Sequence, residues 1–104
     1  MNVSNISGIQ EYTTRTEKVS PDKNEERTIY FVNEKAFLVE NKNTIEVRCD
    51  RKLAKLLAEK YESVMESRFY GKGGIEIVNS GQLSAVEIDD LVRLSYNMSK
   101  EMED

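Results

Sequence analysis

The sequence contains no histidine and no tryptophan, and it has a single cysteine and a single proline. Without histidine, Ser-His and Cys-His nucleophile pairs cannot form, and no metal site can use imidazole ligands. One cysteine cannot build an internal disulfide or a cysteine-rich zinc site. Carboxylate acid–base chemistry and carboxylate-bound magnesium stay open, although the acidic residues show no informative spacing. We therefore expect a protein that is not an enzyme and has no metal or cofactor.

Long apolar runs are also missing, since no stretch approaches the ~20 residues that a membrane helix needs. The N-terminus has neither the basic start nor the apolar stretch of a signal peptide. With 104 residues, of which 38% are hydrophobic, the chain can form one domain around one core. We expect a single cytoplasmic domain with a core over residues 28–99. Residues 1–27 are polar and are a candidate mobile segment, and residues 100–104 are expected to fray.

Strand patterns occupy the first half of the chain. Residues 9–19 alternate weakly, and the polar stretch from Ser20 to Glu26 reads as a loop. Three clearer strands follow, at 28–33, 35–40 and 44–49. In the last of these, Ile45, Val47 and Cys49 share one face, and Glu46 and Arg48 share the other. This alternation predicts an antiparallel sheet with one face buried and the other, including Glu46, in water.

Two helices and one more strand complete the expected order. Asp50 is a plausible N-cap for a helix. The apolar stripe of this helix is expected to consist of Leu53, Leu56, Leu57, Tyr61 and Val64. The glycine-rich segment 66–74 interrupts the pattern before a strand at 75–79. Ser84 and Glu87 then form a capping box that starts the final helix. The order predicts an α+β fold, an antiparallel sheet of about five strands with two helices packed on one face.

From Phe37 to Met98 the sequence resembles the MmcQ/YjbR family of small proteins. The resemblance rests on the order and spacing of six segments: KAFLVEN, TIEVRCD, RKLAKLLAEKYESV, SRFYGK, IEIVNSGQLSAVEIDDLV and RLSYNM. It implies a YjbR-like α+β fold, comparable to frataxin or to secretion chaperones, and a DNA-binding label. It also places Ser67, Arg68 and Lys72 on the family's functional loop, and Ser95 and Tyr96 on its Ser-Tyr pair. The family's tryptophan after the loop lysine and its N-terminal amphipathic helix are missing here.

The middle of the chain is mildly basic, and it contains the candidate binding residues. The candidate nucleic-acid-binding face consists of Arg48, Arg51, Lys52, Lys55, Arg68, Tyr70 and Lys72. Cations of this kind neutralise phosphates and an aromatic ring stacks on a base. The sequence therefore suggests a binding module for nucleic acid. A protein-interaction or chaperone-like adaptor that uses a sheet face or the acidic last helix is the alternative function.

Each candidate feature also has a purely structural interpretation. The loop 68–74 could be an ordinary turn in which glycines supply positive φ, or its backbone could hold an anion or small molecule. The helix cations could form a solvated face paired with Glu59 and Glu62. Cys49 alternates with core residues and is expected to be buried. Tyr96 is expected to have a buried ring and a hydroxyl in water.

Overall fold

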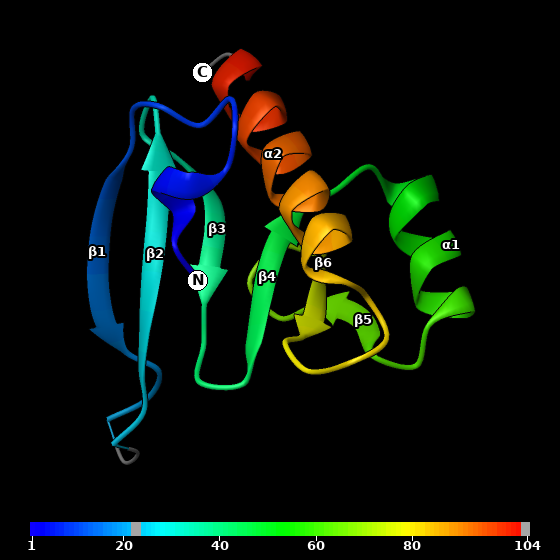
Figure 1. Cartoon of the computed structure of the whole chain (residues 1–104). Coiled ribbons are helices and arrows are strands. Elements are labelled where there is room, and N and C mark those ends of the chain that lie inside the picture. Colours follow the sequence, from blue (N-terminus) through cyan, green and yellow to red (C-terminus); the bar gives the residue numbers. More distant parts are fainter. Residues whose placement is uncertain (22–23, 103–104) are drawn as a thin grey trace.

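The fold is a six-stranded antiparallel sheet with two helices, seen in a computed structural model that describes residues 1–21 and 24–102 (Figure 1). The elements in chain order are the 3-10 helix η1 (Val3–Asn5), β1 (Thr13–Lys18), β2 (Glu26–Val32), β3 (Lys35–Glu40), β4 (Thr44–Arg48), α1 (Arg51–Lys60), β5 (Val64–Ser67), β6 (Gly71–Val78) and α2 (Ala85–Glu101). The strand order is β1-β2-β3-β4-β6-β5. The predicted α+β class is confirmed, with six strands. No helix in the described part of the chain is long and apolar enough to cross a membrane.

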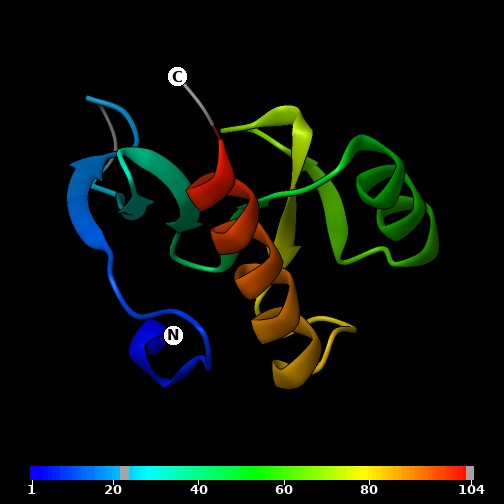
Figure 2. The same ribbon diagram turned by 90° about the horizontal axis from the view of Figure 1, so that it is seen from above.

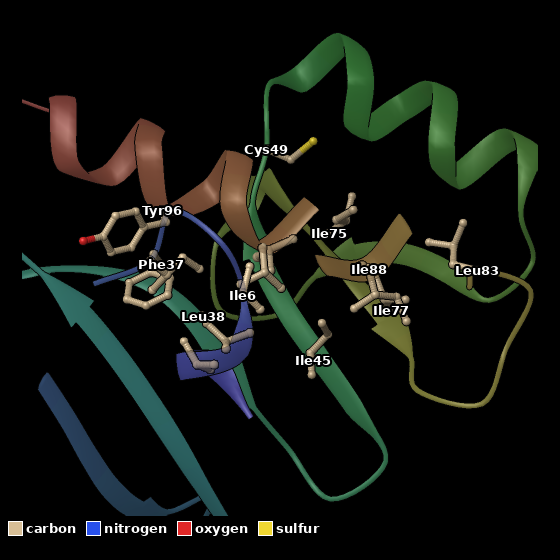
Figure 3. Close-up of a cluster of buried hydrophobic side chains, with 14 of the residues drawn as sticks. Ile6, Phe37, Leu38, Ile45, Cys49, Ile75, Ile77, Leu83, Ile88 and Tyr96 are labelled. Carbon is tan, nitrogen blue, oxygen red and sulfur yellow. The ribbon is translucent and has the colours of Figure 1, made fainter. Parts of the chain in front are cut away.

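The helices pack beside different strands of the sheet (Figures 1 and 2). Helix α2 packs on β3 and β4, whereas α1 packs on β5 and β6. Between helices and sheet lies one continuous apolar core (Figure 3). Strand register builds it, because Leu38 lies opposite Val47 and Val47 lies opposite Ile75, so that all three side chains share one face. The helix caps at Asp50 and at Ser84 with Glu87 form as predicted.

The N-terminal segment contributes to this core. Val3, Ile6 and Ile9 are each at most 4% exposed and pack against the sheet residues. The first strand covers only 13–18 of the predicted 9–19. The core therefore begins before residue 28. The first 27 residues are mostly polar, but three apolar side chains spaced three residues apart are enough to anchor the segment to the core.

The segment after the first helix differs from the prediction. Helix α1 ends at Lys60, Val64 begins strand β5, and Leu56 is 63% exposed. Strand β6 begins at Gly71, four residues earlier than expected. The predicted stripe continued through Val64 because Tyr61 and Val64 are three residues apart, which is also the spacing of a helical repeat. The glycine-rich segment is the bend of this hairpin, and Gly71 adopts φ +62°.

The face of the sheet away from the core is not fully exposed to water, so the prediction for Glu46 is wrong. Glu46 is only 1% exposed, and a second apolar cluster of Ile29, Ala36 and Val39 lies on the sheet beside Tyr70. The chain from Ser67 to Tyr70 folds over this face and shields it. A Cβ at Gly74 would lie 2.6 Å from the Val47 carbonyl oxygen and 2.7 Å from Tyr70 Cβ. Only glycine lets Tyr70 lie this close to the strand.

Helix α2 is joined to the sheet where β3 and β4 stop pairing. Their register ends at Leu38 and Val47, and the next pair would be Phe37 and Arg48. The Ser95 hydroxyl takes the place of that pair: it accepts from the Arg48 amide at 2.8 Å and donates to the Phe37 carbonyl at 2.6 Å. Ser95 is fully buried. The small serine side chain therefore lets the helix approach the backbone of both strands.

The ends of the predicted loop and tail are only partly described. Helix α2 continues through Glu101, so the expected fraying from residue 100 does not apply to Lys100 and Glu101, which are helical. Residues 103–104 of that tail lie outside the described residues. The predicted loop at 20–26 ends as β2 begins at Glu26, and its residues 22–23 also lie outside the description.

Candidate functional site

The start of helix α1 determines where its cations lie. The Asp50 carboxylate accepts from the backbone amides of Lys52 at 3.0 Å and Leu53 at 3.3 Å. This cap satisfies two of the amide groups that a helix leaves free at its N-terminus. Arg51, Lys55 and Glu59 then recur every four residues and lie on one side of the helix. The helix is thus fixed with two cations and one carboxylate in a row.

A groove of about 460 Å³ runs between this side of α1 and the β5–β6 hairpin. Small and apolar residues, among them Ala54, Ala58, Gly74 and Ile75, form part of its lining. The charged residues that line it are Arg51, Lys55, Glu59, Glu66 and Lys72. Three cations against two carboxylates leave the groove with an excess of positive charge. Its volume lies in the range of about 300–1,000 Å³ that is usual for small-molecule sites.

The three groove cations have no ion-pair partner in the described part of the chain. Within residues 1–21 and 24–102, Arg51, Lys55 and Lys72 take part in no ion pair, and all three are exposed. Their charge is therefore available to a ligand. Of the six cations proposed from the sequence, three line this groove and three do not.

Arg68 and Arg48, in contrast, are bound within the protein. Arg68 donates two hydrogen bonds to Glu76, from Nε to Oε1 at 2.9 Å and from Nη2 to Oε2 at 2.7 Å. Arg48 donates from Nε to the Ser99 hydroxyl at 3.0 Å and from Nη2 to the Ala36 carbonyl at 3.0 Å. These contacts hold the hairpin and the end of α2 in place, which gives both arginines a structural role.

Tyr70 and Lys52 also lie away from the groove. Tyr70 packs in the second apolar cluster, with the Arg48 guanidinium 5.0 Å from its ring centre. Its hydroxyl is buried and has no hydrogen-bond partner within the described residues. Burial raises the pKa of this hydroxyl, so it stays protonated at neutral pH. Lys52 is exposed on α1 but does not line the groove.

Two buried carboxylates lie on the far face of the sheet, directly opposite each other on β4 and β6. Glu46 and Glu76 are 1% and 3% exposed. Burial acts to raise the pKa of Glu76, but the hydrogen bonds from Arg68 and Thr44 outweigh it and lower that pKa. The same contacts with Glu76 raise the pKa of Arg68. The pair Arg68–Glu76 is therefore ionised at neutral pH.

Glu46 is held by neutral donors. Its Oε1 accepts from the Ser67 hydroxyl and from the Phe69 amide, each at 2.9 Å, and its Oε2 accepts from Asn41 Nδ2 at 2.9 Å. These bonds fasten the chain from Ser67 to Tyr70 onto the sheet. Sequence reasoning missed this cluster because alternation placed both glutamates in water. The sequence does place one glutamate in each of two predicted strands. It also places two hydrogen-bond donors, Ser67 and Arg68, in the loop before the second strand.

Cys49 and Tyr96 are structural residues. Cys49 is 2% exposed, and burial together with the adjacent Asp50 carboxylate raises its pKa to about 11, so the thiol is protonated at neutral pH. Its predicted place in the core is confirmed. The Tyr96 ring is buried as expected, but its hydroxyl donates to the Glu11 carbonyl at 3.0 Å instead of facing water. Among the described residues, no group of three or more cysteine or acidic side chains is arranged to hold a metal ion.

Comparison with known proteins identifies the fold. No protein-family model matches the sequence, and no curated protein matches it. The structure is similar to the crystal structure of a protein from Pseudomonas syringae determined by a structural genomics consortium. The TM-score is 0.66 at 14% sequence identity, and the match covers 83% of this chain and 86% of that one. At this identity, the likeness shows that the two chains share a fold.

Proposed function

We propose that this protein is a non-enzymatic binding module that holds an anionic ligand in the groove between α1 and β6. The observation that carries the proposal is the convergence of Arg51, Lys55 and Lys72, none of which has an ion-pair partner within the described residues. Unpaired cations beside the apolar lining of the groove suit a ligand with a negative charge at one end and an apolar part at the other. The carboxylates Glu59 and Glu66 on the same groove would orient it.

The ligand that fits best is a carboxylate or phosphate attached to an apolar chain or ring. The apolar part would cover Ala54, Ala58 and Ile75, and the charged part would meet the cations. The resemblance to the MmcQ/YjbR family favours nucleic acid, whose phosphates could meet the same cations. None of the described residues that line the groove is aromatic, so they offer no platform for base stacking. A cytoplasmic location is part of the same proposal.

Thermal unfolding with two probes tests the proposal. We choose decanoate, which has one carboxylate on an apolar chain, and a single-stranded DNA oligonucleotide, both at about 50 mM salt. A ligand at about ten times its Kd stabilises by about 1.4 kcal/mol, which raises the Tm of a domain this size by roughly 5–10 °C. The proposal predicts a shift with decanoate that is lost in a Lys55→Glu/Lys72→Glu variant.

Lys52→Glu is the matched control, because it changes a cation on the same helix outside the groove. Groove binding predicts that Lys52→Glu keeps the decanoate shift. A polyanion that follows the whole basic face would instead be weakened by Lys52→Glu as well, and its binding would fall steeply with salt. If neither probe shifts the wild-type Tm at any concentration, the proposed function is wrong.

A protein-interaction module is the second candidate function. Two large apolar side chains support it: Leu56 on α1 is 63% exposed and Val86 on α2 is 70% exposed. A partner protein that covered either side chain would remove apolar surface from water, so each is a candidate contact. A partner that is captured in the presence of nuclease and high salt, and lost in a Leu56→Glu variant, would support this function. Capture that is unaffected by Leu56→Glu would count against it.

A further inference from the structure

Strand β1 forms one edge of the sheet, and among the described residues no strand pairs with its outer side (Figure 1). It pairs on one side with β2 over six residues, from Thr13 with Phe31 to Lys18 with Glu26. Five of its six residues are exposed, and Glu17 is half-buried. An edge strand of this length offers a row of unpaired backbone groups to another strand. This surface is separate from the proposed groove, which lies beside the opposite edge.

The hydrogen-bonding pattern shows which backbone groups face outward. The Val19 amide donates to the Glu25 carbonyl at 2.9 Å, and these two residues continue the β1–β2 register by one pair beyond Lys18 and Glu26. In an antiparallel ladder, directly bonded pairs alternate with unbonded ones. Thr13, Arg15 and Glu17 therefore bond to β2. The backbone groups of Thr14, Thr16 and Lys18 point away from the sheet. The side-chain oxygens of Thr16 and Thr28, 3.4 Å apart, fit this assignment, since unbonded pairs bring their side chains closer.

Only a few registers allow this edge to pair with its own copy. In a two-fold antiparallel pair the outward residues must meet outward residues, so the axis passes through residue 15, 16 or 17. An axis at Arg15 places the two Arg15 side chains opposite each other, and an axis at Glu17 does the same with two carboxylates. Like charges directly opposite are destabilising. An axis at Thr16 instead places each Arg15 opposite the Glu17 of the other copy.

The register centred on Thr16 also agrees with the side chains already present on the sheet. Glu17 accepts from Arg27 Nη2 at 2.6 Å, and the copy's Arg15 would approach it from the other side. Arg15 Nε lies 3.7 Å from Glu17 Oε2 of its own strand, but the Arg15 side chain is 62% exposed, so the guanidinium can turn to the Glu17 of the other copy. On the face of the sheet away from Arg15 and Glu17, the Thr16 side chains of the two copies would lie next to each other. With Thr28 of each copy beside its own Thr16, they would form a row of four threonines. Threonine pairs of this kind favour strand association.

We propose that two copies of this chain associate through β1, antiparallel and centred on Thr16, so that their sheets become continuous. Charges on an edge strand usually prevent pairing. Here the alternation of Arg15 and Glu17 disfavours the registers centred on Arg15 and on Glu17, and it favours the one centred on Thr16. The interface is one short strand on each side, smaller than the ~1,200 Å² that stable complexes bury. The dimer is therefore weak and forms at high protein concentration.

Cross-linking at single cysteines tests the register. The natural Cys49 is buried and does not compete for a thiol reagent. The proposal predicts that Thr16→Cys is rapidly joined by a thiol cross-linker shorter than about 10 Å, because position 16 meets itself at the axis. Thr14→Cys is the matched control on the same face. Its two copies would be four residue steps of about 3.4 Å apart, beyond the reagent. Equal cross-linking of both variants, or none of Thr16→Cys at millimolar protein, would overturn the proposal.

Charge variants test the pairing without cysteines. Arg15→Glu and Glu17→Arg each place like charges opposite each other in a homodimer, so each alone is expected to dimerise at least about tenfold more weakly than wild type. Mixed in equal amounts, they restore both opposite-charge pairs, and sedimentation velocity should show dimers again. Circular dichroism checks that each variant is folded. If the mixture stays as monomeric as its components, or if each variant alone dimerises like the wild type, the Thr16-centred pairing is wrong.

Discussion

The two faces of the sheet use the same alternating strands to build very different interiors. On one face the helices cover aliphatic and aromatic side chains, including Phe37, Val47 and Ile75, all at 0% exposure. On the other face a four-residue stretch of chain covers two glutamates, which are satisfied by hydrogen bonds. The first interior depends on the area of apolar surface removed from water. The second depends on the hydrogen bonds that satisfy both carboxylates, so the residues that donate them are less interchangeable.

The helix-covered face should show the largest response to a single substitution. Phe37 contacts Tyr12, Tyr30 and Tyr96, with ring centres 6.3, 6.1 and 5.0 Å away. Phe37→Ala removes a fully buried ring and is expected to cost about 3–5 kcal/mol of unfolding free energy, measured by urea denaturation. Phe69→Ala, on the other face and 37% exposed, is the control and should cost much less. Equal losses would mean that the two faces are packed alike.

The polar face should respond less strongly, and in a way that depends on hydrogen bonds. Glu46→Ala leaves the Ser67 hydroxyl, the Phe69 amide and Asn41 Nδ2 without their acceptor. We expect a loss of about 1–3 kcal/mol in urea denaturation, the usual cost of stranded buried donors. Glu66→Ala removes an exposed carboxylate and should stay within about 0.5 kcal/mol of wild type. A neutral Glu46→Ala would show that the stretch over the sheet does not depend on this carboxylate.

The smallest effect concerns the pH dependence of the same face. The folded-state pKa of Glu76 is lowered from 4.5, because its hydrogen bonds with Arg68 and Thr44 outweigh burial. A carboxyl of this kind contributes stability that is fully present above about pH 4.5, and that is lost as the pH falls through the lower folded pKa. Comparing wild type with Glu76→Gln by urea denaturation from pH 7 to pH 3 should show the two curves converging in acid. Arg68 is two-thirds exposed, so solvent screening keeps the effect small. Parallel curves would contradict the assignment.

Local signals in the sequence predicted the local parts of the structure. The caps at Asp50 and Ser84, the two central strands and the last helix all depend on residues that are close together in the chain. Strand β5 was missed because Val64 follows Tyr61 at a helical spacing of three residues, which carried the predicted apolar stripe past the end of the helix at Lys60. The burial of Glu46 depends on a segment more than twenty residues away, which alternation within one strand cannot reveal.

The candidate site was predictable only in part for the same reason. Spacing along α1 indicates that Arg51 and Lys55 share a side of the helix, whereas Lys72 joins them through the tertiary fold. The sequence could not tell that Arg68, four residues before Lys72, turns to the opposite face and pairs with Glu76. Charge counts record which cations exist, and only the fold determines which of them already have a partner.

The Ser95 hydroxyl between β3 and β4 has a consequence for how the protein opens. Because the bond that would join Phe37 to Arg48 passes through a helix side chain, the sheet cannot keep its full ladder once α2 moves away. Detachment of the helix would break both hydrogen bonds and, at the same time, expose the apolar face of the central strands to water. Helix α2 and the central strands therefore form one cooperative unit, and local release of the C-terminal helix is disfavoured.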